Sequence, residues 1–295
     1  MLLLLLSPVL LVAPRCWARP RTPPQQQMLG QSGGDTHCCA EYRSYTPPDA
    51  PPDAPIDALL PASGLHSSTA EAAAVRAAPW EGGPLAMARR PECYLLWLCM
   101  LALQGGGLFL TVNLGSMVQS RGGGVAAATV VTVFSCAQGF ARLVTGSLSN
   151  ALVNRGAART WYLVLLHAVM ALGHAMLCLR GATPLLAGAA LVGWGFGSTF
   201  PLLVLVVAEL FGKPRLASNY MVFDGTPGAV GALLFAKLLC SAVYAQHAAE
   251  DGSCHGVECF RLSHEVVAAA QLVAAAVGAV LSLRVRIAYQ FGPEP

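Results

Sequence analysis

Long apolar stretches separated by short polar breaks dominate the chain from Cys93 onward. The stretches run over Tyr94–Val118, Val125–Asn150, Trp161–Leu179, Pro184–Phe211, Asn219–Ala245 and Glu265–Leu283. Each is long enough for a helix to cross a hydrocarbon core roughly 30 Å thick. The breaks, such as "QSRGGG" and "GKPRLAS", are rich in residues that end helices. The pattern therefore predicts an all-α fold: a polytopic membrane protein with a six-helix bundle.

Residues 1–90 follow a different pattern. The chain opens on an apolar run in "MLLLLLSPVLLVAPRCWARP" that is too short to span a bilayer. The segment that follows is rich in Pro, Ala, Gly and Ser and has no periodic apolar pattern, which predicts a disordered linker. We therefore divide the chain into an apolar stub (1–18), a cytoplasmic linker (19–90), a six-helix transmembrane domain (91–290) and a cytoplasmic tail (291–295).

The opening apolar run has two interpretations. It has the apolar core of a cleaved secretory signal, although no basic residue precedes that core. Alternatively, it is the cytoplasmic end of an earlier membrane helix whose beginning lies outside this chain, and the linker is then a long cytoplasmic loop. Cleavage would place the linker outside and oppose the distribution of basic residues, which favours the second interpretation.

Basic residues gather on one side of the predicted membrane. If the linker is cytoplasmic, the residues that share its side are Arg89, Arg90, Arg155, Arg159, Lys213, Arg215, Arg284 and Arg286. The opposite side holds Arg121, Arg180 and Arg261. Because cytoplasmic loops are enriched in Lys and Arg, both ends of the six-helix domain are predicted to face the cytoplasm.

Composition narrows the function classes. The chain is 55% apolar and 11% charged, which is typical of a protein whose partner is the lipid bilayer. The net charge is only +3, without a basic block, so nucleic acid is not an expected partner. There is no phosphate loop after a strand, no nucleophile beside a base and no carboxylate pair at membrane depth. We therefore predict no enzymatic activity, no cofactor and no metal.

Two of the ten cysteines form a pair in the sequence "CHGVEC". Cys254 and Cys259 lie in a polar loop on the predicted non-cytoplasmic face, where a disulfide can persist. His255 between them leaves a metal site as the alternative. A disulfide would favour the plasma membrane or the secretory pathway as the location.

Longer motifs show a family resemblance. "FARLVTGSLSNALVNRGAART" (Phe140–Thr160) resembles the Gly-Arg-Leu, Gly-x-Leu-Ser pattern and basic loop of a major facilitator superfamily half. "ELFGKPRLASNYMVFDGTPGAVGALLFAKLLCSAVY", "CHGVECFRLSH" and "LSLRVRIAY" resemble the C-terminal region of the nodulin-like transporters, which include the nuclear-fusion-defective type. The resemblance covers about Pro91–Gln290. It implies the C-terminal six-helix half of a twelve-helix transporter that works by alternating access.

The cytoplasmic gate implied by this resemblance is altered here. The superfamily usually has an aspartate where Asn150 stands and a basic residue where Ala151 stands. In this chain the basic residues, Arg155 and Arg159, come later. The usual charge relay is therefore expected to be changed or weakened.

Glu209 lies near the cytoplasmic end of the fourth stretch, two residues before "FGKPR". A structural salt bridge is the simpler interpretation for an acid in that place. The expected partners are Lys213, Arg215 or Arg155.

Ionisable residues deep in a span are candidates for function because they are costly in lipid. Arg142 resembles the membrane-buried arginine with which monocarboxylate porters engage an anionic substrate. Those porters have an acid one turn earlier, where this chain has Gln138, so proton coupling through that pair is in doubt. Asp224 is predicted at similar depth in the fifth stretch, and an Arg142–Asp224 pair is one hypothesis. A buried arginine held by helix carbonyls and a neighbouring acid is the other.

Gln104 and Asn113 are further polar candidates for the cavity wall. In the fifth stretch, Pro227 with Gly225 and Gly228 predicts a bend, since proline removes a backbone hydrogen bond. "GWGFGSTFP" (Gly193–Pro201) predicts a bendable fourth helix. Close helix packing through small residues would explain the same glycines.

His167 and His174 are seven residues apart and so share one face of the third helix. The resemblance makes that helix peripheral. We therefore expect a packing or lipid-interface role rather than a proton relay.

These observations predict a membrane transporter of small solutes, with an organic anion or monocarboxylate as substrate. Six helices form only one wall of a cavity, so the expected partner is a missing N-terminal six-helix half or a second copy in a homodimer. The alternative is a membrane scaffold or sensor that does not transport.

Overall fold

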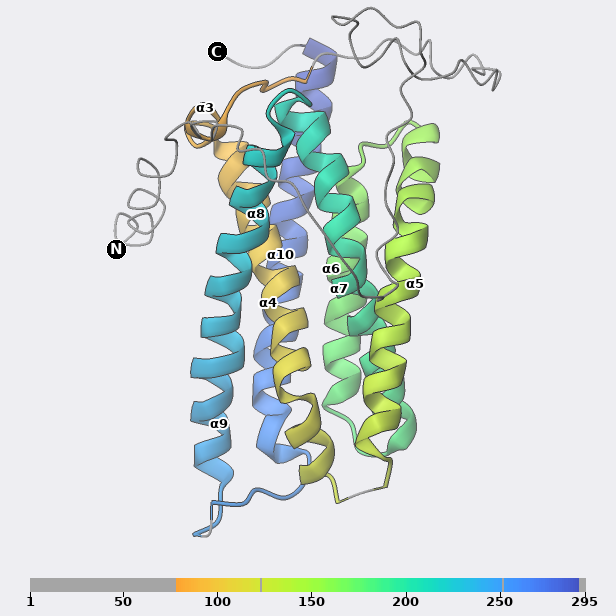
Figure 1. Cartoon of the computed structure of the whole chain (residues 1–295), viewed down its shortest axis with the longest axis vertical. Helices are drawn as coiled ribbons and strands as arrows, with labels where there is room; N and C mark the ends of the chain where they lie inside the picture. The colour runs from red at the N-terminus through yellow and green to blue at the C-terminus, as the bar shows by residue number, and fades with distance from the viewer. Residues whose placement is uncertain (1–77, 123, 251, 292–295) are drawn as a thin grey trace, which may run out of the picture. The chain divides into compact units, whose positions relative to one another are not determined.

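The computed structural model describes residues 78–122, 124–250 and 252–291. The apolar stub, residues 19–77 of the linker and the tail beyond residue 291 lie outside the described residues. The described elements are all helical (Figure 1). They are α3 (Pro84–Met87), α4 (Pro91–Ser120), α5 (Ala127–Asn154), α6 (Thr160–Leu177), α7 (Ala182–Phe211), α8 (Leu216–Gly231), the π-helix η2 (Ala232–Leu239), α9 (Cys240–His247) and α10 (Glu258–Phe291).

Within the described residues, six helices are long and apolar enough to cross a membrane. Five of them are single α-helices, and the remaining one is the continuous span α8–η2–α9, from Leu216 to His247. The predicted all-α fold with six spans is confirmed. The chain is therefore a multi-pass membrane protein.

Local sequence explains where several helices start and stop. Pro91 begins α4, where its missing N–H has no helical partner to lose, and Glu92 in the first turn complements the helix dipole. Gly156 (φ 80°) and Gly212 (φ 85°) follow α5 and α7 in the left-handed conformation that glycine adopts readily. These glycines let the chain reverse in short turns.

Several helices pack against helices that are not next to them in the sequence (Figure 1). α5 packs on α7, α6 packs on α10 and α7, and α4 packs on α8, η2 and α10. Buried aliphatic and aromatic side chains of α4, α6 and α7 form most of the core. The spans α5 and α8–η2–α9 are the least buried. They therefore border the faces of the bundle on which the described residues place no further helix.

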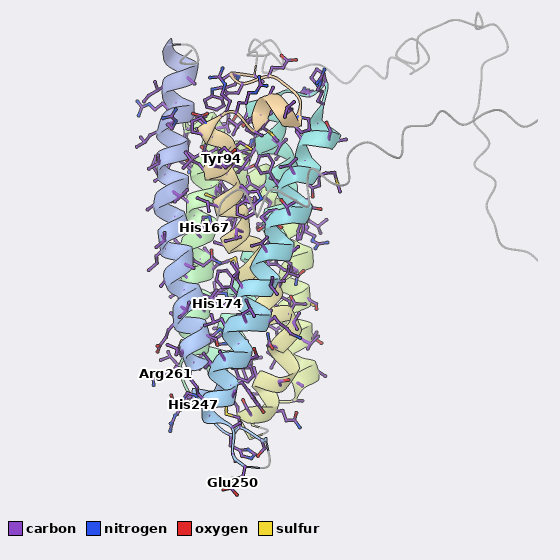
Figure 2. The ribbon with its side chains drawn as sticks, turned by 90° about the vertical axis from the view of Figure 1, so that its left-hand side faces the viewer. Tyr94, His167, His174, His247, Glu250 and Arg261 are labelled. Carbon is purple, nitrogen blue, oxygen red and sulfur yellow. A yellow bond between two sulfur atoms is a disulfide. The ribbon has the colours of Figure 1, made fainter. Side chains whose placement is uncertain are left out.

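The bundle has two ends, which we call the linker end and the disulfide end. The linker end comprises residues 78–90 and the turns at 155–159 and 212–215. The disulfide end comprises the described residues of the connections after α4 (121–122 and 124–126), after α6 (178–181) and after α9 (248–250 and 252–257). Figure 2 shows Tyr94 near the linker end and Arg261, His247 and Glu250 near the disulfide end.

The last part of the predicted linker is folded. Trp80 is buried, and its N–H donates to the carbonyl of Leu210 (3.1 Å). The Asn219 Nδ2 donates to the carbonyl of Gly82 (2.8 Å). Residues 78–90 therefore belong to the six-helix domain, because their backbone groups bond to carbonyls at the end of α7 and to the Asn219 side chain at the start of α8. The six-helix domain therefore begins before residue 91, its predicted first residue.

The fifth span is irregular one turn after the predicted bend. α-Helical conformation continues through Gly225, Pro227 and Gly228 to Gly231. The π-helix follows over Ala232–Leu239. π-Helical turns widen the backbone locally and leave carbonyls available for other donors. The sequence indicated the irregular span but misplaced the irregularity.

Candidate functional site

Arg142 lies on the exposed side of α5. Its guanidinium stacks over the Phe200 ring of α7, 4.9 Å from the ring centroid. At 1.5 Å per residue, Arg142 is about 18 Å from Asn154, the last residue of α5. The cation–π contact holds the charged group against the bundle but leaves it accessible.

Asp224 approaches this region from α8. Tyr220, one turn earlier in α8, is close enough to both Asp224 and Arg142 to be influenced by their charges. Among the described residues, Arg142 and Asp224 form no ion pair within 4.0 Å. The hypothesised direct pair is therefore not formed in this conformation, and Tyr220 is the residue that feels both charges. We call Arg142, Phe200, Tyr220 and Asp224 the α5–α8 polar cluster.

Gln138 is half-buried one turn before Arg142. A Cβ added at Gly197 of α7 would lie 2.4 Å from the Gln138 carbonyl oxygen and 2.7 Å from its Cα. Gly193 approaches Phe134 in the same way. These glycines allow α5 and α7 to pack backbone against backbone, and α7 runs unbroken through them. Helix packing, rather than bending, is what "GWGFG" provides here.

Gln104 of α4 repairs the hydrogen bond that Pro227 removes. Pro227 has no N–H to donate to the carbonyl of Phe223, four residues earlier. The buried Gln104 Nε2 donates to that carbonyl instead, at 2.9 Å. A Cβ at Gly228 would lie 2.6 Å from Gln104 Oε1, so glycine leaves the space that the amide occupies. Three of the residues singled out in the sequence thus form one local structure.

We expect Gln104→Leu to destabilise the protein by about 1–3 kcal/mol, because it leaves the Phe223 carbonyl buried without a donor. Pro227→Ala supplies a backbone N–H to the same carbonyl. The double variant should therefore lose less stability than the two single losses added together. Thermal unfolding of the purified variants measures this coupling, with Gln119→Leu at an exposed position of α4 as the control. Additive losses would contradict the repair.

Asn113 also binds the fifth span. Its Nδ2 donates to the carbonyl of Phe109 in its own helix (3.0 Å) and to that of Ala236 in the π-helix (3.4 Å). Trp97 Nε1 donates to Thr226 Oγ1 (2.8 Å). Gln104 and Asn113 therefore connect α4 to the irregular span in this conformation.

The Arg159 cluster lies at the linker end and joins α5, α6 and α7. The buried Arg159 donates from Nε to Glu209 Oε1 (2.7 Å) and from Nη1 to Ser149 Oγ (2.6 Å) and Asn150 Oδ1 (2.8 Å). Arg159 was not among the partners predicted for Glu209, so that prediction was incomplete. Arg155, four residues earlier, is exposed.

Asn150 thus takes part in the cluster as a neutral acceptor. An aspartate in its place would add a second carboxylate around one guanidinium. The glutamate of α7 supplies the single negative charge instead. Sequence reasoning identified Asn150, Arg159 and Glu209, but it missed Ser149 and the arrangement of these groups around Arg159.

The histidines of α6 form buried polar pairs with α10. His167 Nδ1 lies 2.7 Å from Gln271 Oε1, and His174 Nδ1 lies 3.1 Å from His264 Nδ1. Gln271 Nε2 donates to the carbonyl of Ala102 in α4 (2.7 Å), which fixes the amide so that His167 Nδ1 is the donor. His264 Nε2 lies 3.1 Å from Met117 Sδ.

These pairs serve packing and do not face lipid, because both α6 histidines and Gln271 are fully buried. Figure 2 shows His167 and His174 one below the other along the bundle. The sequence revealed the seven-residue spacing of the two histidines. It did not reveal the partners, Gln271 and His264, although they have the same spacing in the sixth span.

The disulfide end holds the Cys254–Cys259 disulfide. Of the two interpretations of "CHGVEC", the structure has the disulfide. Within the described residues, no group of three or more His, Cys, Asp or Glu side chains could hold a metal ion.

Comparison with known proteins places these observations in a family. Residues 80–291 match the family model described as NFD4, C-terminal domain. The match covers more than half of the chain and agrees with the resemblance to the nuclear-fusion-defective type of nodulin-like transporter. No curated protein matches the chain. No solved structure matches it.

Proposed function

We propose that this protein, which belongs to the NFD4 C-terminal domain family, moves small solutes across a membrane by alternating access. The observation that carries the proposal is the α5–α8 polar cluster. It presents a guanidinium, a phenol and a carboxylate deep in two membrane-spanning helices. The proposal is a transporter with the fold of one half of a major facilitator superfamily protein, and no enzymatic activity is part of it.

The exposure of Arg142 supports a cavity next to α5. A charged side chain facing the hydrocarbon core costs several kcal/mol, so such groups face a bundle interior or a water-filled cavity. Arg142 is exposed on the bundle formed by the described residues, and α5 and α8–η2–α9 are its least buried spans. We infer that six further helices face these spans, from a partner half or from a second copy of this chain. The space between the two halves would hold the solute.

The proposed substrate is a small organic anion. Arg142 offers the charge, and the Phe200 ring beside it offers an apolar surface. Tyr220 is influenced by the charges of both Arg142 and Asp224. An anion that displaced the Phe200 ring from the guanidinium would therefore also be near the phenol. Gln138 does not titrate, so proton coupling through that position is not part of the proposal.

The Arg159 cluster is the proposed latch at the cytoplasmic side. It joins three helices through one guanidinium and lies at the end where basic residues are concentrated. By the positive-inside rule, the linker end is cytoplasmic and the disulfide end is not. A disulfide on the second face suits the plasma membrane or a compartment of the secretory pathway.

Uptake measurements test the proposal. We expect vesicles containing the full-length chain, together with any partner that purifies with it, to accumulate a radiolabelled monocarboxylate such as lactate. Arg142→Gln should reduce the rate by about tenfold or more, because a charge-assisted contact to the anion is lost. Arg286→Gln, which removes an exposed arginine from α10, is the matched control and should retain the wild-type rate.

Two results would count against this assignment. Unchanged uptake in Arg142→Gln would remove the arginine from the site and the anion from the proposal. Absence of uptake of any tested solute, with a stable assembly of known composition, would favour a scaffold or sensor.

A further inference from the structure

A second feature of the molecule lies at the disulfide end, apart from the α5–α8 polar cluster. A cavity of about 340 Å³ opens there between the turn after α4, the turn before α7 and the loop before α10. Two arginines line it, Arg121 and Arg180. The remaining walls include Val118, Val125, Leu185 and Val257. The volume suits a small molecule, and the walls are apolar apart from the two guanidinium groups.

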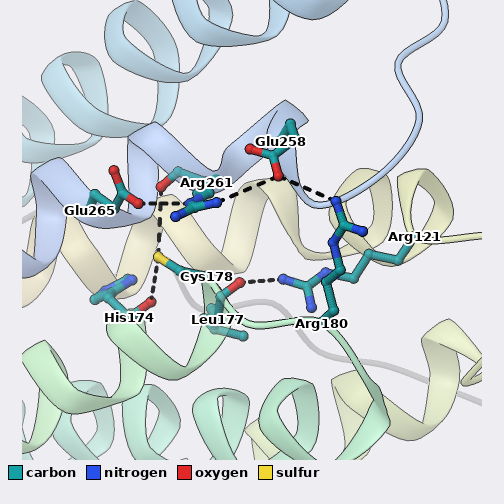
Figure 3. A network of polar contacts seen from close by, with 8 residues as sticks. All are labelled: Arg121, His174, Leu177, Cys178, Arg180, Glu258, Arg261 and Glu265. Carbon is teal, nitrogen blue, oxygen red and sulfur yellow. Dashed lines mark hydrogen bonds and ion pairs between the residues drawn. The ribbon is translucent and has the colours of Figure 1, made fainter.

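Arg121 carries a charge that no described carboxylate balances. Its Nη1 donates to the carbonyl of Leu179 (3.0 Å). Its Nη2 donates to the carbonyl of Leu177, a contact that Figure 3 shows. Its Nε is buried and has no hydrogen-bond partner among the described residues. Burial lowers the pKa of the Arg121 guanidinium. An anion in the cavity would offset that cost.

Arg180 is held only weakly where it is. Figure 3 shows it beside Glu258, and the two groups are 3.6 Å apart. Glu258 also pairs with Arg261 at 3.6 Å. Because the Arg180 and Glu258 side chains are largely exposed, their pair contributes little to stability. Arg180 can therefore turn toward an anion while Glu258 keeps Arg261.

Helix dipoles add to the positive potential of the cavity. Its lining includes Gly181, the N-cap of α7, and Val125, just before α5 begins. Neither α5 nor α7 has a side-chain hydrogen bond capping its first turn. The backbone N–H groups of such turns attract negative charge.

We propose that this cavity binds a small carboxylate with an apolar body, whose charged end meets Arg121 and Arg180 and whose body contacts the valine and leucine walls. The site is separate from the α5–α8 polar cluster and does not depend on the proposed transport function. It gives the protein an anion-binding site on the face opposite the linker end.

Calorimetric titration of the purified full-length protein with sodium benzoate tests the proposal, at constant ionic strength and with sodium acetate for comparison. Benzoate should bind saturably and more tightly than acetate, because only benzoate reaches the apolar walls. Arg121→Gln and Arg180→Gln should each weaken benzoate binding by about tenfold or more. Lys237→Gln, which removes one positive charge from an exposed position in the disulfide-end half of the fifth span without lining the cavity, should change the affinity by less than about twofold.

Arg121 also supports the last turn of α6, so its substitution could unfold the protein. Arg180→Gln removes an exposed side chain and keeps the test decisive in that case. Absence of saturable benzoate binding would overturn the site. Equal losses in Arg180→Gln and Lys237→Gln would show a diffuse surface charge instead, and equal affinity for acetate would overturn the apolar part of the proposal.

Discussion

Gly231→Val is expected to lower the melting temperature of the purified protein by about 5 °C or more, or to prevent its folding. α4 and the fifth span cross where Gly105 and Gly231 meet. A Cβ at Gly231 would lie 2.5 Å from the Gly105 Cα and 2.8 Å from the Leu101 carbonyl oxygen. These are backbone atoms, so no side-chain rotation relieves the contact. Forcing the helices apart costs about 3 kcal/mol or more, which shifts the melting temperature of a domain of this size by several degrees.

Gly225→Val is the matched control for this prediction. Gly225 lies in the same helix, and a Cβ there meets nothing within 4 Å. Valine and glycine differ little in helix propensity, and the exposed position makes no new contact. A melting temperature that falls equally in both variants would show that the α4–α8 crossing is not closely packed.

Arg159→Leu is expected to destabilise the protein by about 3 kcal/mol or more. It leaves the Glu209 carboxylate, the Ser149 hydroxyl and the Asn150 amide oxygen without their common donor. Removing the buried guanidinium is costly because three acceptors lose a charge-assisted hydrogen bond at once. Chemical or thermal unfolding in detergent, followed by tryptophan fluorescence, measures the loss.

Two further variants separate this mechanism from a simple loss of charge. Arg155→Leu removes an exposed arginine from the same turn. Arg155 forms no ion pair with any described residue, so this variant should leave the stability nearly unchanged. Arg159→Leu combined with Glu209→Leu should recover part of the stability, since the carboxylate that loses the guanidinium is then removed as well. If the double variant were less stable than Arg159→Leu alone, the ion pair would not be the source of the effect.

The sequence was sufficient for the spans because their signal is local. Eighteen or more apolar residues between turns predict a membrane helix without any knowledge of its neighbours. The Cys254–Cys259 pair was recognisable for the same reason. Its two cysteines are only five positions apart in the sequence and lie in a loop on the face expected to be oxidising. Gln104, Pro227 and Gly228 were each singled out as unusual in an apolar stretch, which was correct as far as it went.

Contacts between distant segments could not be read in this way. The repair of the Phe223 carbonyl by Gln104 requires knowing that α4 lies against α8. The partner of Glu209 depends on how the turn at 155–159 folds, and a pattern of charges gives several equal choices. Trp80 stands in a segment whose composition resembles a linker. Its burial depends on the Leu210 carbonyl at the end of α7, which accepts a hydrogen bond from the Trp80 backbone N–H.

The paired polar groups of α6 and α10 determine how these helices can move. His167 lies opposite Gln271 and His174 opposite His264, seven residues apart on both helices. Sliding α6 along α10 by one turn would break both pairs in one step and leave each group against aliphatic carbon, which is costly for buried polar atoms. We therefore expect α6 and α10 to move as a single rigid unit during any conformational cycle. Relative motion is then left to the contact between α4 and the π-helix, where an irregular backbone already tolerates a change in register.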